Sequence, residues 1–580
     1  MLKGNCDHSL KPKNPVRIFI IRFLTVLILW CGCGDLRAET TLGFTLDQSY
    51  MTSAGVFRTD GTLIRTLWRK VRYAPGTHSF VWDDKNDSGV DVAPGDYRFK
   101  VIHHNIDYTW EGVIGNTSSR FNGVIRRGFI PIVDMATDGP NLYSALSYNE
   151  GQSQIHVSTI ADPNNLTFAI PPSICTTMSH VTSDGTLYYM ANTGGGFDSG
   201  TNATFIIARR VSDNGIHSFS TGTQLCLQRF PGGGSCYAEH LFASCINVID
   251  GKSNPPTGLA VQKNGPFLAV AQGKLNEVRI LDKKTGAQIS TIGITSPRKI
   301  AFAPNGDLWV ISGTTVQRFE AATLGTTGDP VNTISGFARP ESVSVHPSDD
   351  NVVLVADGGV SQQVKAFDSA GNSLWTYGTL GGGYADDPTI SESKLGFIAN
   401  RTFVTALADG SFWVSDPRNN RSLHFTAQRE FIEQIHYIPA SYVATCDPNQ
   451  PTRVIGGDWF EYEVDYGKPL QPGDPAAAGG SGVWKLKKNW GIGAPVDLIG
   501  SGGFQGLHTV VTMGNGRTYA LAWNFKSGKH ALVELPKMGN LRMTGIEFPF
   551  NRTLYANGDT RLFTYTSPHQ IITQQSVTGF

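Results

Sequence analysis

The sequence predicts an all-β protein in which an N-terminal β-sandwich precedes a β-propeller of six to eight blades. Three observations lead to this prediction. The 580 residues are too many for one compact core, so several domains or a large repeat are expected. Glycine is abundant, with 65 residues, as in chains with many short strands and turns. Alternating strands around a tight turn recur along the chain, as in AFAPNGDLWV at 301–310.

The recurring turns give the repeat its period. Neighbouring turns are mostly about 40 to 50 residues apart, which is the period of propeller blades. Two wider gaps, 185–265 and 410–516, are expected to hold insertions or diverged blades. We therefore assign residues 114–580 to the propeller. The aligned turns are Asp138-Gly139, Asp184-Gly185, Asn264-Gly265, Asn305-Gly306, Asp350-Asn351, Asp409-Gly410 and Asn515-Gly516.

Residues 39–113 form a unit of their own. The stretches DGTLIRTL, GTHSFVWD and APGDYRFKV begin at residues 60, 76 and 93. They resemble the Ig-like module of the flagellar hook-capping protein family, and such modules are found in many exported proteins. The resemblance implies a small β-sandwich with Trp82 in its core and Pro94-Gly95 turning into the last strand. The aspartates at 83, 84, 87 and 91 are predicted turn formers, with a calcium loop as the alternative.

The outer parts of the predicted blades carry a second signature. DPRNNRSLHF at 416–425 and SQQVKAFDSAG at 361–371 follow strands and lead into turns, and NEVRILD at 276–282 is a fainter copy. These stretches resemble the NHL repeat, most clearly over residues 256–430. The resemblance implies that Asp416, Asn420 and Arg421 hold a blade together.

The first 38 residues resemble a secretory signal peptide in composition. Basic residues at 11, 13, 17 and 22 precede a short apolar run at 23–31, and Ala38 offers a small residue for cleavage. The run is short for a transmembrane helix. We expect export to the periplasm, the cell surface or the medium after removal of residues 1–38. A retained N-terminal anchor is the alternative.

Cysteine usage agrees with export. Five cysteines follow the signal segment, and Cys226, Cys236 and Cys245 lie within one short irregular segment. Their spacing predicts a disulfide among these three. A zinc cluster is the competing interpretation, although neither a CxxC pair nor a suitably spaced histidine accompanies them.

Charge and motifs narrow the function. Lys plus Arg equals Asp plus Glu, at 48 each, so no global field favours nucleic acid or anionic lipid. Walker, HExxH, GxSxG and dinucleotide motifs are missing from any fitting context. We therefore predict no nucleic-acid partner, no membrane span after signal removal, no catalytic residues and no cofactor. A divalent cation in the propeller channel is the alternative.

The repeat also selects candidate site residues. Function in a propeller is expected where inner strands begin beside the channel, because loops on a rigid scaffold carry binding. One offset from the turn selects Arg298, Glu341, Thr402 and His508, together with Pro131, Thr177 and Thr257. The first four are predicted to bind a polar ligand or an acidic sugar through the guanidinium fork and the imidazole. The alternative is that Arg298 and Glu341 form an ion pair that only lines the channel.

Two classes of function remain. The first is an exported binding or scaffold protein that recognises a glycan, a peptide or an envelope component. The second is a propeller enzyme acting on carbohydrate or lactone substrates, such as a lactonase, lyase or glycosidase. Some six-bladed lactonases resemble this chain in their APNG turns and hold a metal through several carboxylates, whereas Glu341 is the one acid at the aligned positions.

Overall fold

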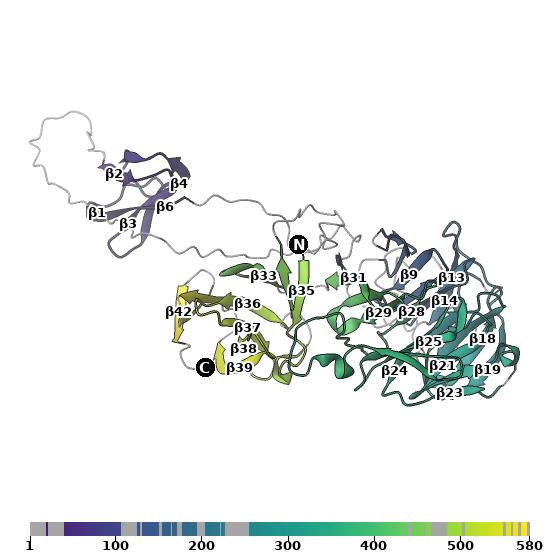
Figure 1. The fold of residues 1–580 in the computed structure, drawn as a ribbon. Helices are drawn as coiled ribbons and strands as arrows, with labels where there is room; N and C mark the ends of the chain where they lie inside the picture. The colour runs from purple at the N-terminus through teal and green to yellow at the C-terminus, as the bar shows by residue number, and fades with distance from the viewer. Residues whose placement is uncertain are drawn as a thin grey trace, which may run out of the picture. The chain divides into compact units, whose positions relative to one another are not determined.

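The computed structural model confirms an all-β protein (Figure 1). The chain divides into two compact units, His8–Glu111 and a second that contains Gly112–Phe580. The structure describes residues 19–20, 40–105, 125–127, 130–149, 153–163, 165–170, 177–193, 204–220, 222–226, 255–326, 328–438, 444–456, 459–465, 484–500, 505–548, 553–557, 561–566 and 570–576.

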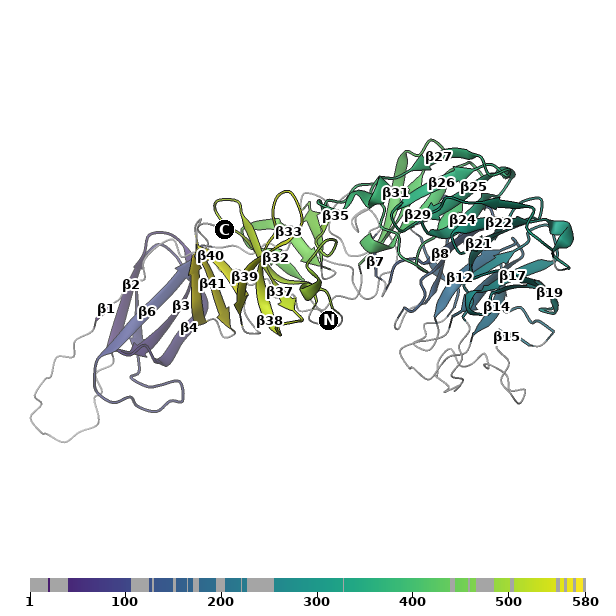
Figure 2. The same ribbon diagram turned by 90° about the horizontal axis from the view of Figure 1, so that it is seen from below.

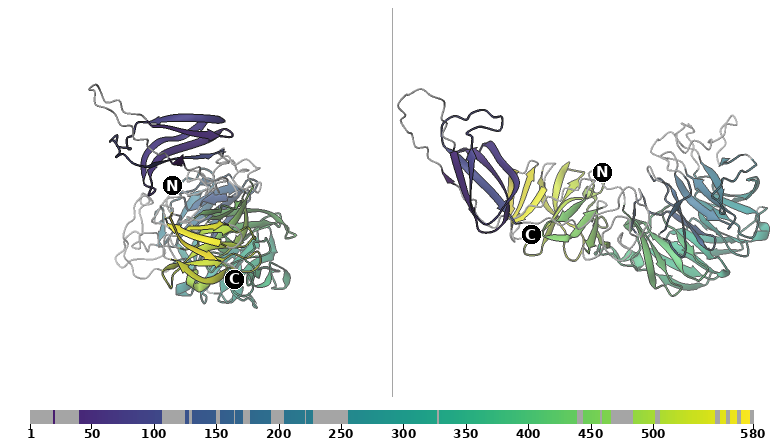
Figure 3. Two further views of the ribbon diagram at one scale, coloured as in Figure 1. Left: turned by 90° about the vertical axis from the view of Figure 1, so that its left-hand side faces the viewer. Right: turned by 90° about the horizontal axis from the view of Figure 1, so that it is seen from above.

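The first unit is a β-sandwich of two sheets, drawn in purple in Figure 3. One sheet has the order β1-β6-β3-β4 and the other pairs β2 with β5. Trp82 is buried between them, and its Nε1 donates to the carbonyl oxygen of Lys85 at 2.9 Å. The strands are β1 (Phe19–Ile20), β2 (Thr40–Leu46), β3 (Tyr50–Arg58), β4 (Leu63–Tyr73), β5 (Gly76–Trp82) and β6 (Tyr97–His104).

The aspartates of this unit act as turn residues. Asp87 accepts hydrogen bonds from the backbone N–H and the hydroxyl of Thr66, and Asp84 accepts one from the hydroxyl of Thr40. Asp83 accepts the backbone N–H of Lys85 two residues on. The carboxylates are thus engaged in local turns and cross-strand contacts, the role expected of aspartate in such loops.

The second unit begins with six sheets that we call blades 1 to 6. Each runs from an inner to an outer strand in chain order, and β7 (Ile125–Arg127) adds to blade 6 parallel to its outer strand. Blade 1 contains β8 (Asp134–Thr137), β9 (Asn141–Ala145), β10 (Ile155–Thr159) and β11 (Thr167–Phe168), and blade 2 contains β12 (Met178–Ser183), β13 (Leu187–Asn192), β14 (Phe205–Arg210) and β15 (Leu225–Cys226). Blade 3 contains β16 (Gly258–Val261), β17 (Phe267–Gln272), β18 (Glu277–Asp282) and β19 (Gln288–Gly293), and blade 4 contains β20 (Pro297–Phe302), β21 (Leu308–Ser312), β22 (Thr315–Phe319) and β23 (Asn332–Ile334). Blade 5 contains β24 (Pro340–His346), β25 (Asp349–Asp357), β26 (Gln363–Phe367) and β27 (Ser373–Tyr377), and blade 6 contains β28 (Val404–Ala406), β29 (Phe412–Asp416), β30 (Arg421–Phe425) and β31 (Phe431–Ile438).

These six blades close into a ring. Consecutive inner strands contact one another from β8 to β28, and β28 contacts β8 in turn, which completes the circle. Figure 2 shows the six sheets grouped together. The ring is therefore a six-bladed propeller, within the range of six to eight blades predicted from the turns.

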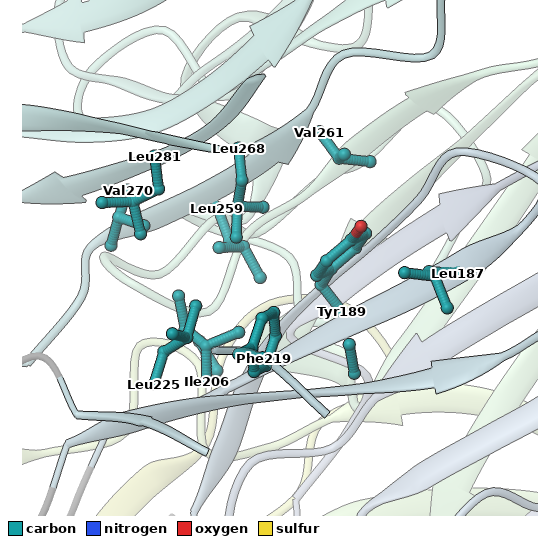
Figure 4. Packing of buried hydrophobic residues seen from close by; sticks show 12 residues of the cluster. Leu187, Tyr189, Ile206, Phe219, Leu225, Leu259, Val261, Leu268, Val270 and Leu281 are labelled. Atoms are coloured by element: carbon teal, nitrogen blue, oxygen red, sulfur yellow. The ribbon is translucent and has the colours of Figure 1, made fainter. Parts of the chain in front are cut away.

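The core of the ring lies between blades. Figure 4 shows this for blades 2 and 3, where side chains such as Tyr189 and Ile206 meet Leu259 and Leu268. Trp309 packs between blades 4 and 5. In the aligned turn of blade 4, Gly306 adopts a φ of 91°, a conformation that favours glycine.

Asp416, Asn420 and Arg421 hold blade 6 together and join it to the connection before it. Arg421 Nε donates to Asp416 Oδ2 at 2.7 Å, and both side chains are buried. Asn420 adopts the left-handed conformation at the end of η5 (Pro417–Asn419). Asp416 Oδ1 also accepts the backbone N–H of Gly396, in the connection that enters the blade. These contacts give the three residues a structural role in the blade.

Three further sheets follow the ring as a second array. Their inner strands contact in the order β32, β36 and β40. Asn489 Nδ2 donates to the carbonyl oxygen of Arg418 at 2.9 Å, and Ile390 N donates to Lys487 O, so the array contacts blade 6 and the connection before it. The strands are β32 (Thr445–Asp447), β33 (Gln450–Gly456), β34 (Phe460–Val464), β35 (Trp484–Asn489), β36 (Leu507–Thr512), β37 (Thr518–Asn524), β38 (Lys529–Glu534), β39 (Arg542–Phe548), β40 (Thr553–Asn557), β41 (Arg561–Thr566) and β42 (Gln570–Ser576).

Some predictions fall outside what the structure describes. The predicted signal segment, residues 1–38, is undescribed apart from β1, and Cys236, Cys245 and the side chain of Cys226 also lie outside the described residues. The sequence assigned residues 114–580 to one propeller, whereas the closed ring takes 134–438 and the array takes 445–576. A turn period gives blade spacing and does not reveal which blade closes a circle. Among the described residues, every helix is too short or too polar to span a membrane.

Candidate functional site

The site lies where the inner strands of blades 4 to 6 begin. In an antiparallel blade the second strand ends and the third strand begins at this same end. The loop between the second and third strands therefore lies on the same face as the loop that enters the first strand. We call it the front face. Arg298 is the second residue of β20 in blade 4, and Glu341 is the second residue of β24 in blade 5.

Arg298, Arg339 and Glu341 come together on this face, and we call them the rim cluster. Arg298 Nη1 lies 3.5 Å from Glu341 Oε2, and Arg339 Nε pairs with Glu341 Oε1. Arg298 also donates through Nη2 to the carbonyl oxygen of Gly313, between β21 and β22. The Glu341 side chain is 1% exposed, whereas those of Arg298 and Arg339 are 23% and 41% exposed. The carboxylate is thus buried beneath two guanidinium groups that reach solvent.

The electrostatics of the rim cluster favour an incoming anion. Burial raises the pKa of Glu341, although Arg339, Arg298 and the backbone N–H of Asn400 favour its ionised form. Burial also lowers the pKa of Arg298, with Arg339 acting in the same direction and Glu341 opposing it. Two cations face one carboxylate, so the cluster has a positive excess. Partly exposed guanidinium groups keep donors available for a carboxylate or phosphate.

Thr402 contributes to the site through the backbone. Its hydroxyl donates to the carbonyl oxygen of Ile398 at 2.8 Å and accepts the Ile398 N–H, and its side chain is buried. The loop that it closes places Asn400 next to Glu341. The equivalent Thr257 likewise holds main chain, because its hydroxyl donates to Pro297 O at 2.6 Å. These threonines shape the front face and do not present their hydroxyls to a ligand.

His508 lies elsewhere. It belongs to β36 of the second array, a strand that packs against β32, β33, β37 and β40. Its ring lies 4.7 Å from that of His530, centroid to centroid. The structure therefore places Arg298, Glu341 and Thr402 on consecutive blades of the ring and His508 in a different group of sheets, although all four share one offset from a turn.

A second group of charges lies among the inner strands, and we call it the central cluster. Lys299 Nζ of blade 4 lies 2.6 Å from Asp134 Oδ1 of blade 1, the blade opposite in the ring. His180 Nδ1 of blade 2 lies 3.4 Å from Asp134 Oδ2, and its Nε2 lies 3.0 Å from Pro256 O. Asp134 also accepts the backbone N–H of Val181. All three side chains are buried, so the cluster ties opposite blades together.

The pKa values in the central cluster reflect this burial. Burial alone would raise the pKa of Asp134, but Lys299 and His180 hold it below its ordinary value. Burial lowers the pKa of Lys299, and Asp134 opposes that shift. Burial and the charge of Lys299 lower the pKa of His180, with Asp134 opposing them. A neutral imidazole and a closed ion pair are the forms that this environment favours.

Sequence reasoning missed Arg339 and the whole central cluster. Arg339 stands two residues before Glu341, a spacing that places side chains on one side of an extended chain, and this signal was available. Asp134 and Lys299 are far apart in the sequence and meet only because the ring has six blades. Among the described residues, groups of three or more His, Cys, Asp or Glu able to hold a metal ion are absent.

Comparisons with known proteins found similarity to solved structures only. No protein family's sequence pattern matches the chain, and no curated protein matches it. Solved structures that align with the chain include a chain of the nidogen/laminin complex, at 12% identity, with 51% of this chain and 93% of that chain covered and a TM-score of 0.33. A Bacteroides thetaiotaomicron protein of unknown function has 11% identity and a TM-score of 0.34, and the alignment covers 73% of this chain and 98% of that chain. The Dos1 propeller has 11% identity and a TM-score of 0.31, and the alignment covers 75% of this chain and 96% of that chain. The assignment of a propeller rests on the sheets themselves.

Proposed function

We propose that the chain is an exported recognition protein that binds a glycan, a peptide or an envelope component at the front face of its ring. The observation that carries this proposal is the rim cluster. It holds two partly exposed guanidinium groups over one buried carboxylate, where two inner strands of a closed ring begin. Fixed donors on a rigid scaffold are the usual basis of polar recognition.

The other parts fit the same proposal. The blades, as NHL-like repeats, would form the scaffold of the front face, and the sandwich would be an accessory Ig-like module. The composition of residues 1–38 supports the proposed export, and the balanced charge agrees with a partner other than nucleic acid. The proposal needs no cofactor, because arginine supplies charge and hydrogen-bond donors by itself.

The test is a binding screen with a check for turnover. The full chain is applied to arrays of acidic and neutral oligosaccharides and of peptides, and bound molecules are recovered and analysed for cleavage. Binding without products, weakened by Arg339→Met, supports the proposal. Arg517→Met is the matched control, because Arg517 pairs with Glu534 in the second array at 3.0 Å.

Two results would overturn the proposal. Products released from a bound oligosaccharide would establish the enzyme alternative. Binding that survives Arg339→Met and fails in Arg517→Met would move recognition away from the front face.

A further inference from the structure

Two exposed apolar side chains stand on the front face beside the rim cluster. Val360 is 81% exposed and Leu380 is 71% exposed. Val360 lies in the loop between β25 and β26, and Leu380 begins η4 (Leu380–Gly383) in the connection from blade 5 to blade 6. Single exposed apolar residues are common, so their neighbourhood decides whether they matter.

Backbone contacts make the two side chains and the rim cluster one continuous surface. Gly381 N donates to Ser361 O at 2.9 Å, which joins the loop of Val360 to that of Leu380. The same loop approaches the charges at its other end. A Cβ at Gly358 would lie 3.1 Å from Glu341 Oε1, and one at Gly359 would lie 3.4 Å from the Cβ of Arg339. The segment 358–361 therefore links the cations to the apolar pair.

We infer that this surface, made of Arg298, Arg339, Val360 and Leu380, docks an acidic peptide segment that also carries apolar side chains. The inference rests on the proposed function and names the chemical class of its ligand. The cations complement aspartate or glutamate, while Val360 and Leu380 offer apolar area to a neighbouring side chain of the same segment.

A peptide fits this surface better than a glycan does. Sugars are commonly held by stacking on aromatic rings as well as by polar contacts. The aromatic residue closest in sequence to the rim arginines, Phe337, is buried and packs edge-on against Phe367. Exposed aliphatic side chains next to cations instead match the mixed acidic and apolar side chains of a peptide.

A random 12-residue peptide library selected on the full chain tests the inference. The selected peptides are expected to be enriched in Asp and Glu together with Leu, Ile, Val or Phe. Affinity is then measured by fluorescence anisotropy for one selected peptide and for its copy with every acid replaced by its amide. We expect the amide copy to bind at least about tenfold more weakly, and added salt to weaken the acidic peptide.

Matched variants locate the binding. Arg339→Met and the pair Val360→Ser with Leu380→Ser should each weaken the selected peptide by about tenfold or more. Val496→Ser with Met538→Ser is the control, because these side chains are 82% and 84% exposed in the second array. Melting temperature is recorded for each variant, so a folding defect is distinguished from loss of a contact.

Each outcome bears on the inference. Recovery of no peptide, of neutral or basic peptides, or of peptides insensitive to the front-face variants would overturn it. Binding of an oligosaccharide that Arg339→Met abolishes would also overturn it while leaving the proposed recognition function intact. Absence of any ligand at the front face would overturn both.

Discussion

The rim cluster and the central cluster are built from adjacent residues of one strand and behave differently. Arg298 and Lys299 follow each other on β20, and each pairs with a carboxylate on another blade. Both side chains of the Lys299–Asp134 pair are buried, whereas in the Arg298–Glu341 pair only the glutamate is buried and the arginine is partly exposed. Burial, and not residue type, thus separates a charge that holds the ring together from one that is available to a ligand.

The comparison of the two clusters is tested most strongly by removing the cation of each one in turn. Lys299→Met leaves Asp134 without its amine inside the ring, and loss of one partner of a buried pair costs about 3–5 kcal/mol. Arg298→Met leaves Glu341 paired with Arg339, and should cost about 1 kcal/mol or less. Urea unfolding of both variants measures the difference. Equal losses would contradict the distinction between the clusters.

Acid provides a second way to separate the clusters. The folded pKa of His180 is lowered, so unfolded chains take up its proton first as pH falls below about 6.5. Its contribution to stability is present above that pH and declines, by up to about 1.4 kcal/mol per pH unit, until its folded pKa is reached. His180→Gln should flatten the stability profile between pH 7 and 5, as followed by urea midpoints.

Buried His436 also contributes to the loss of stability at low pH. Burial lowers its pKa to about 3, so it adds to acid destabilisation in the same direction. Glu341 at the rim has the opposite sign: its folded pKa is raised, and the stability that it contributes is lost as pH rises through that value. Glu341→Gln should therefore leave the profile between pH 7 and 5 at least as steep as that of the wild type. A flattened profile in Glu341→Gln alone would contradict this assignment.

Glu341→Gln is expected to have the smallest effect on stability. It also tests whether the buried carboxylate competes with a ligand for the rim arginines. Glu341→Gln removes the buried negative charge and leaves both arginines in place, so unfolding free energy should change by about 1 kcal/mol or less. An acidic peptide should bind this variant more tightly, because the carboxylate no longer competes for the guanidinium groups. Anisotropy titration measures it, and weaker binding would show that Glu341 itself contacts the ligand.

The sequence predicted the blades better than it predicted their closure. Asn305-Gly306 and four of its equivalents mark turns in which the glycine takes a positive φ, namely those at Gly139, Gly185, Gly410 and Gly516. The same offset found Arg298 and Glu341, whose pairing needs only neighbouring blades. It also selected His508, because local spacing is the same in the ring and in the second array. Only the closure of six blades brings Lys299 to Asp134, and no local pattern encodes that contact.

The affinity of a selected acidic peptide for the Arg298→Met and Lys299→Met variants tests the central claim most directly. Both are measured at a temperature at which each variant is folded. Arg298→Met should bind about tenfold more weakly than the wild type with little change in melting temperature. Lys299→Met should melt at a lower temperature and keep the wild-type affinity. Unchanged affinity in Arg298→Met, or lost affinity in folded Lys299→Met, would contradict the division between a binding rim and a structural centre.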